Sequence, residues 1–457
     1  MERVSEREFE VVIIGMGPGA EYVAEELAKA GVPVAAVEDR LVGGECPYWG
    51  CIPSKMMIRA ANLLTEGRRI SGMSGGAVIS PSWAPVAKRI RDEATDDWDD
   101  KVAADRFTDL GGTLFRGHAR ISAPGEVTVG DDVLRATRGI VIGTGTEPAI
   151  PPIDGLAQTP YWTNHQAVET EAVPRSLLIL GGGAVGTELG QVFARFGTAV
   201  TVIEETPRLL PAEEPESGEL LARVFQAEDI AVNTGAPAES VRHDGQEFTV
   251  TLAGGKQLRG QRLLVATGRK TDLAGLGVAA VGLDETARFI AVDDRMRAAA
   301  GVWALGDVVG EGAFTHMSMY HGRIILGELL GRPRHRAEYH AVPRVTFTDP
   351  EIGAVGMTEA QAREFHGDRI RIAVSRVPAS ARGWIHKAGN DGFIKLVIDS
   401  ERSVLVGATS AGPTGGEVLG MLTLAVHARI PVQRLTEMIY AYPTFHRAVE
   451  DALREMA

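Results

Sequence analysis

The stretch EVVIIGMGPGAEYVAEELAKAGVPVAAVE, residues 10–38, decides the fold. An apolar run at residues 11–14 predicts a buried parallel strand, and a second apolar strand is expected to end at Glu38. Between them lie a helical segment and three small residues in the spacing G-x-G-x-x-A, namely Gly15, Gly17 and Ala20. Glycines permit a tight turn beside a pyrophosphate, the helix N-terminus stabilises its charge, and the final carboxylate reaches a ribose hydroxyl. The stretch therefore predicts a dinucleotide-binding unit.

The same pattern occurs a second time, in SLLILGGGAVGTELGQVFARFGTAVTVIE, residues 176–204. Its small residues are Gly181, Gly183 and Gly186, and its final carboxylate is Glu204. The first glycine and the carboxylate are 23 positions apart in both copies, from 15 to 38 and from 181 to 204. A single glycine-rich turn is weak evidence, but a complete unit repeated with equal spacing predicts two nucleotide-binding domains.

Glu204 also bears on the choice of nicotinamide cofactor. A carboxylate at this place accepts a hydrogen bond from the 2′-hydroxyl of NAD and repels the 2′-phosphate of NADP. The next residue, Glu205, is acidic as well, so NADH is favoured over NADPH. Arg208 nearby could meet a phosphate, which keeps NADPH open as the less favoured cofactor.

Composition restricts the classes of function. A chain of 457 residues suggests two to four domains, and its net charge of −13 argues against nucleic acid or an anionic membrane as partner. The N-terminal residues are charged and show no signal peptide, and no apolar run approaches the roughly 18 residues of a spanning helix. We therefore expect a cytoplasmic protein.

The two cysteines of the chain lie in GGECPYWGCIPSK, residues 43–55, as Cys46 and Cys51. Structural disulfides are rare in the cytoplasm, where a close cysteine pair is more often catalytic or metal-binding. Two cysteines without a nearby histidine cluster make a poor zinc site, so no metal is expected. The pair is interpreted as a redox centre.

With these motifs assembled, the chain resembles the pyridine nucleotide-disulfide oxidoreductases, the family of dihydrolipoamide dehydrogenase, glutathione reductase and mercuric reductase. The resemblance rests on GMGPGA, GGECPYWGCIPSK, GGGAVGTELG, ATGRKTD, ALGDV and VTFTDPEIGAVGMTEAQA. It implies an α/β fold with two Rossmann-like domains and a C-terminal α+β dimerisation domain, in a homodimer. The expected boundaries are 1–150 and 271–337 for the FAD domain, 151–270 for the NAD(P)H domain and 338–457 for the dimerisation domain.

The resemblance also implies roles for individual residues. NADH would reduce the flavin, which would open a Cys46–Cys51 disulfide; Cys51 would be the charge-transfer thiolate and Cys46 the thiol that attacks the acceptor. Lys55 would lie at the flavin edge, paired with Glu188. The expected FAD contacts are Gly15, Gly17, Ala20, Glu38, Gly44, Lys55, Ala119, Gly145, Asp307 and Thr315. The expected NAD contacts are Gly181, Gly183, Gly186, Glu204, Ala236 and Gly268.

The chain departs from the family pattern near its C-terminal end. Disulfide reductases of the family supply a His-Pro-x-x-x-Glu segment across the dimer, whereas this chain has AYPTFHRAVEDAL, residues 441–453. Tyr442 stands in place of the histidine and Arg447 in place of the glutamate, with His446 four residues after the tyrosine. A tyrosine has a pKa of about 10 and is a poor base near neutrality, while an arginine would suit an anionic substrate.

Three functions remain open at this point. The leading hypothesis is an NADH-dependent reductase of a disulfide or similar two-electron acceptor, with Tyr442 or His446 handling protons. The first alternative is a flavin reductase of quinones or metal ions, similar to mercuric reductase, in which the disulfide is secondary. The second alternative is a redox-sensing or structural flavoprotein subunit of a larger assembly.

Overall fold

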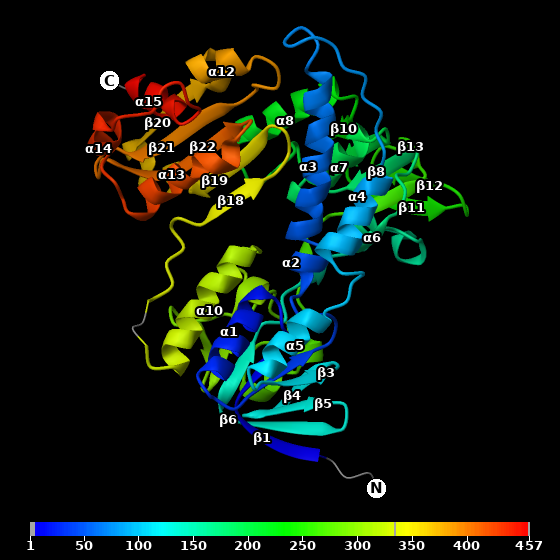
Figure 1. The fold of residues 1–457 in the computed structure, drawn as a ribbon, viewed down its shortest axis with the longest axis vertical. Coiled ribbons are helices and arrows are strands. Elements are labelled where there is room, and N and C mark those ends of the chain that lie inside the picture. The colour runs from blue at the N-terminus through cyan, green and yellow to red at the C-terminus, as the bar shows by residue number, and fades with distance from the viewer. Residues whose placement is uncertain (1–4, 333–334, 456–457) are drawn as a thin grey trace. The chain divides into compact units, whose positions relative to one another are not determined.

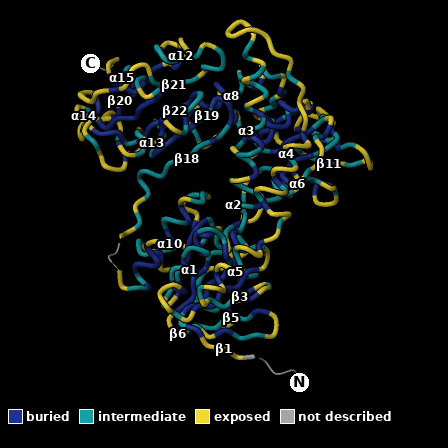
Figure 2. The backbone as a smooth tube through the Cα atoms, viewed as in Figure 1, coloured by how far each residue is buried: buried dark blue, intermediate teal, exposed yellow. Residues whose placement is uncertain are grey.

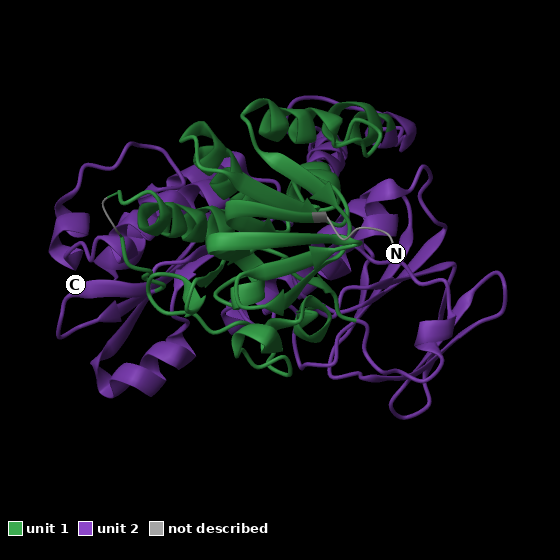
Figure 3. Cartoon of the chain, turned by 90° about the horizontal axis from the view of Figure 1, so that it is seen from below, with its two compact units in different colours: residues 1–53, 88–149, 269–339 green, residues 54–87, 150–268, 340–457 purple. Residues whose placement is uncertain are grey.

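The computed structural model describes residues 5–332 and 335–455, and its internal contacts divide the chain into two units (Figure 3). The ranges of the first unit are Met1–Pro53, Lys88–Ala149 and Arg269–Tyr339, and those of the second are Ser54–Ala87, Ile150–Gly268 and His340–Ala457. The first unit holds most of the predicted FAD domain, whereas residues 54–87 belong to the second unit. The second unit joins the residues predicted as NAD(P)H and dimerisation domains, whose boundary stays a prediction.

The first unit is built on a mixed eight-stranded sheet with a parallel centre, in which β1 (Ser5–Ile14) is an inner strand. This strand pairs with β2 (Val34–Glu38) on one side and β6 (Asp132–Ile142) on the other, both parallel to it. Its residues Val11 to Ile14 are buried, as the apolar run predicts, and the strand is dark where it enters the core (Figure 2). The order β16-β17-β6-β1-β2-β3 completes the main path.

Helix α1 (Pro18–Lys29) follows β1 and lies beside α10 (Thr315–Leu329), which comes from the far end of the unit's sequence (Figure 1). The two helices approach so closely that a Cβ on Gly19 would lie 2.3 Å from the Ser318 hydroxyl oxygen. A glycine is therefore required at position 19 for packing rather than for a turn. This close contact fixes α10 against the nucleotide-binding turn.

The remaining elements of the first unit are short. Those along its chain are α2 (Glu45–Tyr48), η1 (Ile90–Ala94), α5 (Lys101–Asp109), β3 (Thr113–Arg116), β4 (Ala119–Ala123), β5 (Glu126–Val129), β7 (Glu147–Pro148), β15 (Arg269–Lys270), α9 (Leu273–Leu276), η3 (Val278–Val281), β16 (Arg297–Ala299), β17 (Val302–Ala304) and η4 (Gly306–Val309). Two helices cross the boundaries of the units along the chain, α3 (Cys51–Arg68) and α4 (Ala84–Arg89). Pro53 lies in the first turn of α3, where its missing N–H removes no helical hydrogen bond.

The second unit contains a parallel sheet with the strand order β10-β9-β8-β14. Strand β8 (Ser176–Leu180), helix α7 (Ala184–Arg195) and β9 (Ala199–Ile203) form the second copy of the repeated unit. Around them are η2 (Leu156–Gln158), α6 (Asn164–Glu169), α8 (Pro215–Ala227), β10 (Ala231–Asn233) and β14 (Arg262–Val265), with an antiparallel sheet of β11 (Ala238–His243), β12 (Phe248–Leu252) and β13 (Gln257–Gly260).

The C-terminal part of the second unit is a five-stranded antiparallel sheet in the order β18-β19-β22-β21-β20. Its strands are β18 (Pro343–Thr346), β19 (Glu351–Gly356), β20 (Ile370–Arg376), β21 (Phe393–Asp399) and β22 (Val404–Gly412). The accompanying helices are α11 (Glu359–His366), η5 (Gly367–Arg369), η6 (Val377–Ala379), α12 (Ala381–His386), α13 (Gly415–His427), α14 (Val432–Glu437) and α15 (Arg447–Arg454). The predicted fold class, with two Rossmann-like sheets and an α+β C-terminal module, is confirmed.

Lys395 ties the C-terminal sheet to the nucleotide-binding part of the second unit. Its side chain on β21 is only 3% exposed, and its ammonium lies 3.0 Å from Glu214, 2.7 Å from Glu216 and 2.9 Å from Glu359. Glu214 is equally buried, so its charge depends on the lysine. Removing one partner of a buried ion pair leaves the other charge uncompensated, which costs more than a surface pair contributes.

We predict that Lys395→Met lowers the free energy of unfolding by about 3 kcal/mol because Glu214 loses its counter-charge. The matched control is Lys101→Met, because Lys101 is 70% exposed and pairs with Asp105 on the surface. That change is expected to cost less than about 0.5 kcal/mol. Urea unfolding of both variants measures the difference, and equal losses would contradict an anchoring role for Lys395.

Candidate functional site

The first glycine turn is closed by the carboxylate of Glu38. One carboxylate oxygen accepts a hydrogen bond from the Met16 N–H at 2.6 Å, and the other accepts from the Arg40 N–H at 2.8 Å. Burial raises the pKa of Glu38, and this effect is larger than the lowering of the pKa by the two backbone hydrogen bonds. The side chain predicted to reach a ribose therefore also holds the turn in shape.

The turn leaves free space where a pyrophosphate would lie. Gly15 has φ +85°, and a Cβ there would lie 2.6 Å from the Gly143 carbonyl oxygen, so the backbone itself requires glycine. Around Gly17, by contrast, a Cβ would meet nothing within 4 Å. Gly17 is the N-cap of α1 and makes no side-chain capping bond, so helix N–H groups point into this space. Gly44 packs against Gly17, since its Cβ would be 2.8 Å from the Gly17 Cα. These residues fit a bound dinucleotide.

Asp307 lies at the start of η4, directly after strand β17. Its carboxylate accepts a hydrogen bond from the Thr146 hydroxyl at 3.1 Å and lies 3.9 Å from Arg269 Nε. Burial raises the pKa of Asp307, and the Arg269 guanidinium opposes that effect. Gly145, next to Thr146, has φ +66° with open space at its Cβ position. Asp307 and the open turn at Gly145 therefore form a polar surface that suits a nucleotide.

Both cysteines are reduced and lie in the first unit, with Cys46 in α2 and Cys51 opening α3. The Cys51 sulfur lies 3.3 Å from the hydroxyl of Thr315, the first residue of α10. A hydrogen bond with the Cys51 side chain raises the pKa of Cys46, and burial raises it further. The structure thus brings three predicted site residues together at the N-termini of two helices, where negative charge is stabilised.

Lys55 and Glu188, both in the second unit, form an ion pair. Lys55 lies one turn after Cys51 on α3, and its ammonium is 2.9 Å from a carboxylate oxygen of Glu188 on α7. The other oxygen of Glu188 accepts a hydrogen bond from the Phe347 N–H at 2.8 Å. The ammonium also lies 4.6 Å from the centre of the Phe347 ring. Glu188 is buried while Lys55 is partly exposed, so the glutamate holds the lysine in place.

The second nucleotide turn repeats the first. One carboxylate oxygen of Glu204 accepts from the Gly182 N–H at 2.6 Å, and the other from the Thr206 N–H at 2.7 Å. Gly181 has φ +107° and packs on the Ala266 carbonyl, where a Cβ would be 2.3 Å away. Cβ atoms added at Gly183 and Gly268 would have no other atom within 4 Å. Two other predicted contacts lie against this turn: the Ala236 N–H donates to the Glu204 carbonyl at 3.1 Å, and Gly186 packs on Gly181.

The C-terminal segment presents aromatic and basic groups to solvent. Tyr442 is 69% exposed, and the Arg447 guanidinium lies 5.3 Å from the centre of its ring. Arg447 also pairs with Glu450 at 2.9 Å. His446 is exposed at the start of α15, and Phe445 between them packs against His386 on α12. The tyrosine and histidine therefore project from one short segment of the second unit.

Comparison with known proteins identifies the chain. A model of the pyridine nucleotide-disulphide oxidoreductases matches residues 9–322, and a model of their dimerisation domain matches residues 342–453. The chain belongs to the pyridine nucleotide-disulphide oxidoreductase family. This confirms the predicted class of enzyme, a flavoprotein oxidoreductase using FAD and a pyridine nucleotide, with a dimerisation domain at its C-terminal side.

Individual relatives span nearly the whole chain. It is 32% identical to the dihydrolipoyl dehydrogenase of Thermus scotoductus, over 97% of this chain and 96% of that protein. It is 33% identical to the mercuric reductase of Streptomyces lividans, over 97% and 95% respectively. Among solved structures, the HOCl-induced flavoprotein disulfide reductase RclA from Escherichia coli matches with a TM-score of 0.85 at 27% identity, over 98% of this chain and 99% of that one.

Two residues that contact the candidate site, Arg269 and Phe347, were not predicted from the sequence. Arg269 donates through Nε to the Thr146 hydroxyl at 2.7 Å and faces Asp307. Phe347 contacts both members of the Lys55–Glu188 pair. Arg269 lies in the motif ATGRKTD and Phe347 in VTFTDPEIGAVGMTEAQA, two of the motifs on which the family resemblance rests. Their place in these motifs could have marked them as site residues. The predicted contact Ala119 begins β4 and is buried, two residues after Gly117, whose N–H donates to the Glu38 carbonyl.

Two other classes of site were searched for. Within residues 5–332 and 335–455, no group of three or more histidine, cysteine or acidic side chains is arranged to hold a metal ion. In the same described part of the chain, every helix is too short or too polar to cross a membrane.

We predict that Gly17→Asp weakens FAD binding by at least roughly 100-fold, because a carboxylate would enter the phosphate space. The fold should survive, since aspartate is a good N-cap and its Cβ meets no atom. Fluorescence titration of the apoprotein with FAD measures the affinity, and thermal unfolding of the apoprotein checks the fold. Gly76→Asp, on an exposed loop with equally open space, is the matched control and should bind FAD normally.

Proposed function

We propose that the protein is an NADH-dependent reductase of a small-molecule disulfide, with Cys46 and Cys51 as its redox-active pair. The observation that carries the proposal is the arrangement of these two side chains. They are hydrogen-bonded to each other, and the Cys51 sulfur lies at the start of α3 within 3.3 Å of Thr315. A dithiol so placed can close to a disulfide by giving up two electrons and two protons, as a two-electron carrier requires.

The two thiols have different tasks in this proposal. The raised pKa of Cys46 is the direction expected where Cys46 keeps its proton and donates it to the Cys51 sulfur. Cys51, at a helix N-terminus and beside the Thr315 hydroxyl, is then the thiolate. Bound FAD would supply the electron pair, taken from NADH, that opens the Cys46–Cys51 disulfide.

Acceptor reduction then follows thiol–disulfide exchange. A base removes the Cys46 proton, and the Cys46 sulfur attacks one sulfur of the acceptor, releasing its other half as a thiolate. Cys51 next attacks Cys46, which re-forms the Cys46–Cys51 bond and releases the second half of the acceptor. Two electrons have then left the protein; one product thiol takes the proton removed from Cys46, and the other takes a proton from solvent.

Cys46 needs an external base, and two residues of the C-terminal segment are candidates. Tyr442 occupies the place that the family gives to a histidine, and His446 lies four residues further on. An imidazole titrates near neutrality while a phenol does so at a pKa of about 10, which favours His446 as the proton acceptor. Arg447, over the tyrosine ring, suits an anionic acceptor.

We further propose a cytoplasmic homodimer. The family places the C-terminal segment beside the partner's thiols, and the dimerisation domain carries exposed apolar side chains that support self-association. These are Leu424, Met438, Ile439 and Tyr442, of which Ile439 is 97% exposed. A close cysteine pair that acts in redox chemistry is typical of a compartment where structural disulfides are rare, which supports the cytoplasm.

A thiophilic metal ion is the second candidate acceptor. Mercuric reductases of several bacteria are 31–33% identical to this chain over 95–98% of its length. The bacterial reductase RclA has been solved as a Cu(II) complex. Since this sequence has two cysteines, Cys46 and Cys51 would supply the thiolate ligands of such an ion, bound as substrate.

We predict that Cys46→Ser lowers the turnover of disulfides at least roughly 100-fold while NADH-dependent quinone reduction survives, since only the exchange step needs the second thiol. Steady-state assays with a panel of small disulfides, quinones, Hg(II) and Cu(II) measure this. Disulfide reduction that persists in Cys46→Ser would refute the proposal. Turnover of metal ions alone by the parent enzyme would favour the second candidate, and no turnover of any acceptor would favour a sensing subunit.

The base can be identified in the same assays. His446→Gln is expected to lower disulfide turnover roughly 10-fold or more and to change the pH dependence of that turnover, because a general base is lost. Tyr442→Phe removes only a hydroxyl and is the matched control. A larger loss in Tyr442→Phe than in His446→Gln would assign the proton to the tyrosine instead.

NADH preference rests on Glu204 and Glu205. We predict that Glu204→Ser lowers the ratio of kcat/KM for NADH over NADPH roughly 10-fold or more, since the 2′-phosphate then meets no carboxylate at position 204. Because Glu204 also holds Gly182 and Thr206, activity with both cofactors should fall as well. An unchanged ratio would remove Glu204 from the basis of selectivity.

A further inference from the structure

His321 is a fully buried histidine with no place in the proposed reaction. It lies on α10, six residues after Thr315, and its exposed fraction is 0%. Its ring faces the Gly306–Asp307 turn rather than the thiols, because its Nδ1 lies 3.1 Å from the Gly306 nitrogen. The histidine therefore contacts the backbone directly before Asp307.

The bond to Gly306 determines the state of the ring. The Gly306 N–H can only donate, so Nδ1 accepts and the proton of a neutral imidazole must be on Nε2. Nε2 lies 3.2 Å from the Tyr339 hydroxyl oxygen, to which it then donates. Burial lowers the pKa of His321 to about 4, so the ring is neutral near pH 7.

Tyr339 links His321 to Met296 through hydrogen bonds. Its hydroxyl accepts from His321 and donates to the Met296 sulfur, 3.6 Å away. The Met296 carbonyl in turn accepts from the N–H of Ala304, the last residue of β17. Since β17 leads directly into Gly306, the chain of bonds starts and ends on the segment that carries Asp307.

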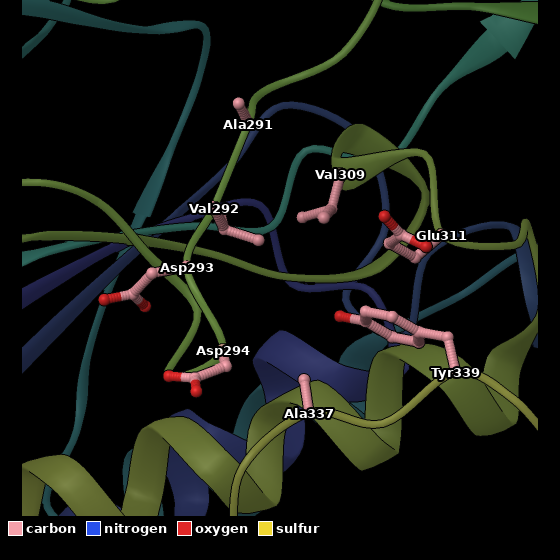
Figure 4. A pocket seen from close by; sticks show the side chains of 8 residues that line it. All are labelled: Ala291, Val292, Asp293, Asp294, Val309, Glu311, Ala337 and Tyr339. Atoms are coloured by element: carbon pink, nitrogen blue, oxygen red, sulfur yellow. The ribbon is translucent and has the colours of Figure 1, made fainter.

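Part of the Tyr339 ring borders a cavity of about 270 Å³, which Val309 and Glu311 also line (Figure 4). Neighbouring side chains therefore do not enclose the ring on that side. Burial raises the pKa of Tyr339, and the charge of Glu311 raises it further, so the hydroxyl stays protonated. Because packing is incomplete on that side, its two hydrogen bonds help to define where the ring lies.

We propose that His321, Tyr339 and Met296 form a support behind the Gly306–Asp307 turn that positions Asp307 for FAD. The inference rests on the proposed function, in which FAD is the bound electron carrier, and on the expectation that Asp307 contacts FAD. From the other side, the Asp307 carboxylate is held by Thr146 and Arg269. The turn is thus fixed through both its backbone and its side chain, and loss of the support lets Asp307 move.

The test measures the FAD dissociation constant and the midpoint potential of the bound flavin in full-length variants. His321→Leu leaves the Gly306 N–H without an acceptor and is expected to weaken FAD binding roughly 10-fold and to shift the potential. His321→Asn keeps an oxygen acceptor near the position of Nδ1 and should recover most of the affinity. Tyr339→Phe keeps the histidine but removes the hydroxyl, and an intermediate loss of roughly 3-fold is expected.

The matched control is Tyr440→Phe in the second unit, because Tyr440 is buried and its hydroxyl donates a bond to the Leu435 carbonyl. It should bind FAD as the parent does. Should His321→Leu fail to fold, His321→Asn and Tyr339→Phe still decide. Equal affinity and potential in Tyr339→Phe and the parent, or no recovery in His321→Asn relative to His321→Leu, would overturn the proposal.

Asp307→Asn separates this inference from the proposed function. If Asp307→Asn binds FAD normally, the assignment of Asp307 to FAD is wrong. If it binds FAD weakly while His321→Leu and Tyr339→Phe bind normally, Asp307 contacts FAD but the support behind it is not needed.

Discussion

The hydrogen bond from the Met16 N–H to the Glu38 carboxylate, 2.6 Å long, holds the first nucleotide turn closed. Its equivalent in the second unit joins the Gly182 N–H to Glu204 at the same distance. In each case the carboxylate at the end of the second strand reaches the middle of the turn that follows the first strand. The N–H groups of the following helix are then fixed in position before any nucleotide arrives, which lowers the entropic cost of binding.

Helix α3 carries two candidate functional side chains, those of Cys51 and Lys55. It begins at Cys51 and places Lys55 one turn later, where Glu188 holds it. The Cys51 sulfur lies at the helix N-terminus beside the Thr315 hydroxyl, whereas the Lys55 ammonium is held by a buried carboxylate and by the face of Phe347. One helix thus sets the spacing between the proposed redox thiol and a cation.

The sequence predicted much of this because the nucleotide units are local patterns. Strand, turn, helix and carboxylate all lie within 29 residues, 10–38 and 176–204, so spacing alone revealed them. The third small residue of each motif is set by the space beside it. In the first copy the Ala20 methyl group fits because it packs on Gly143, which has no side chain. In the second copy Gly186 packs directly on the Gly181 carbonyl, which leaves no room for a methyl group. The Lys55–Glu188 pair, 133 positions apart, was predicted only through the family resemblance.

What the sequence could not predict depends on contacts between distant segments. Nothing local links His321 to Gly306, or Phe347 to Glu188, because each contact arises from the packing of a helix or strand on another part of the fold. The grouping of residues 54–87 with the second unit reflects contacts such as the Lys55–Glu188 pair, not a change in composition. The base for Cys46 also stays a proposal, since Tyr442 breaks the family pattern on which sequence reasoning relied.

The central claim is that the two thiols lie on the electron path. The most direct test is an anaerobic titration of the purified holoenzyme with NADH, followed by the flavin absorption spectrum. If the claim is correct, two electrons per flavin produce a long-wavelength charge-transfer band from the Cys51 thiolate while the flavin stays oxidised. If two electrons bleach the flavin without such a band, Cys46 and Cys51 are not in the path, and the account is wrong.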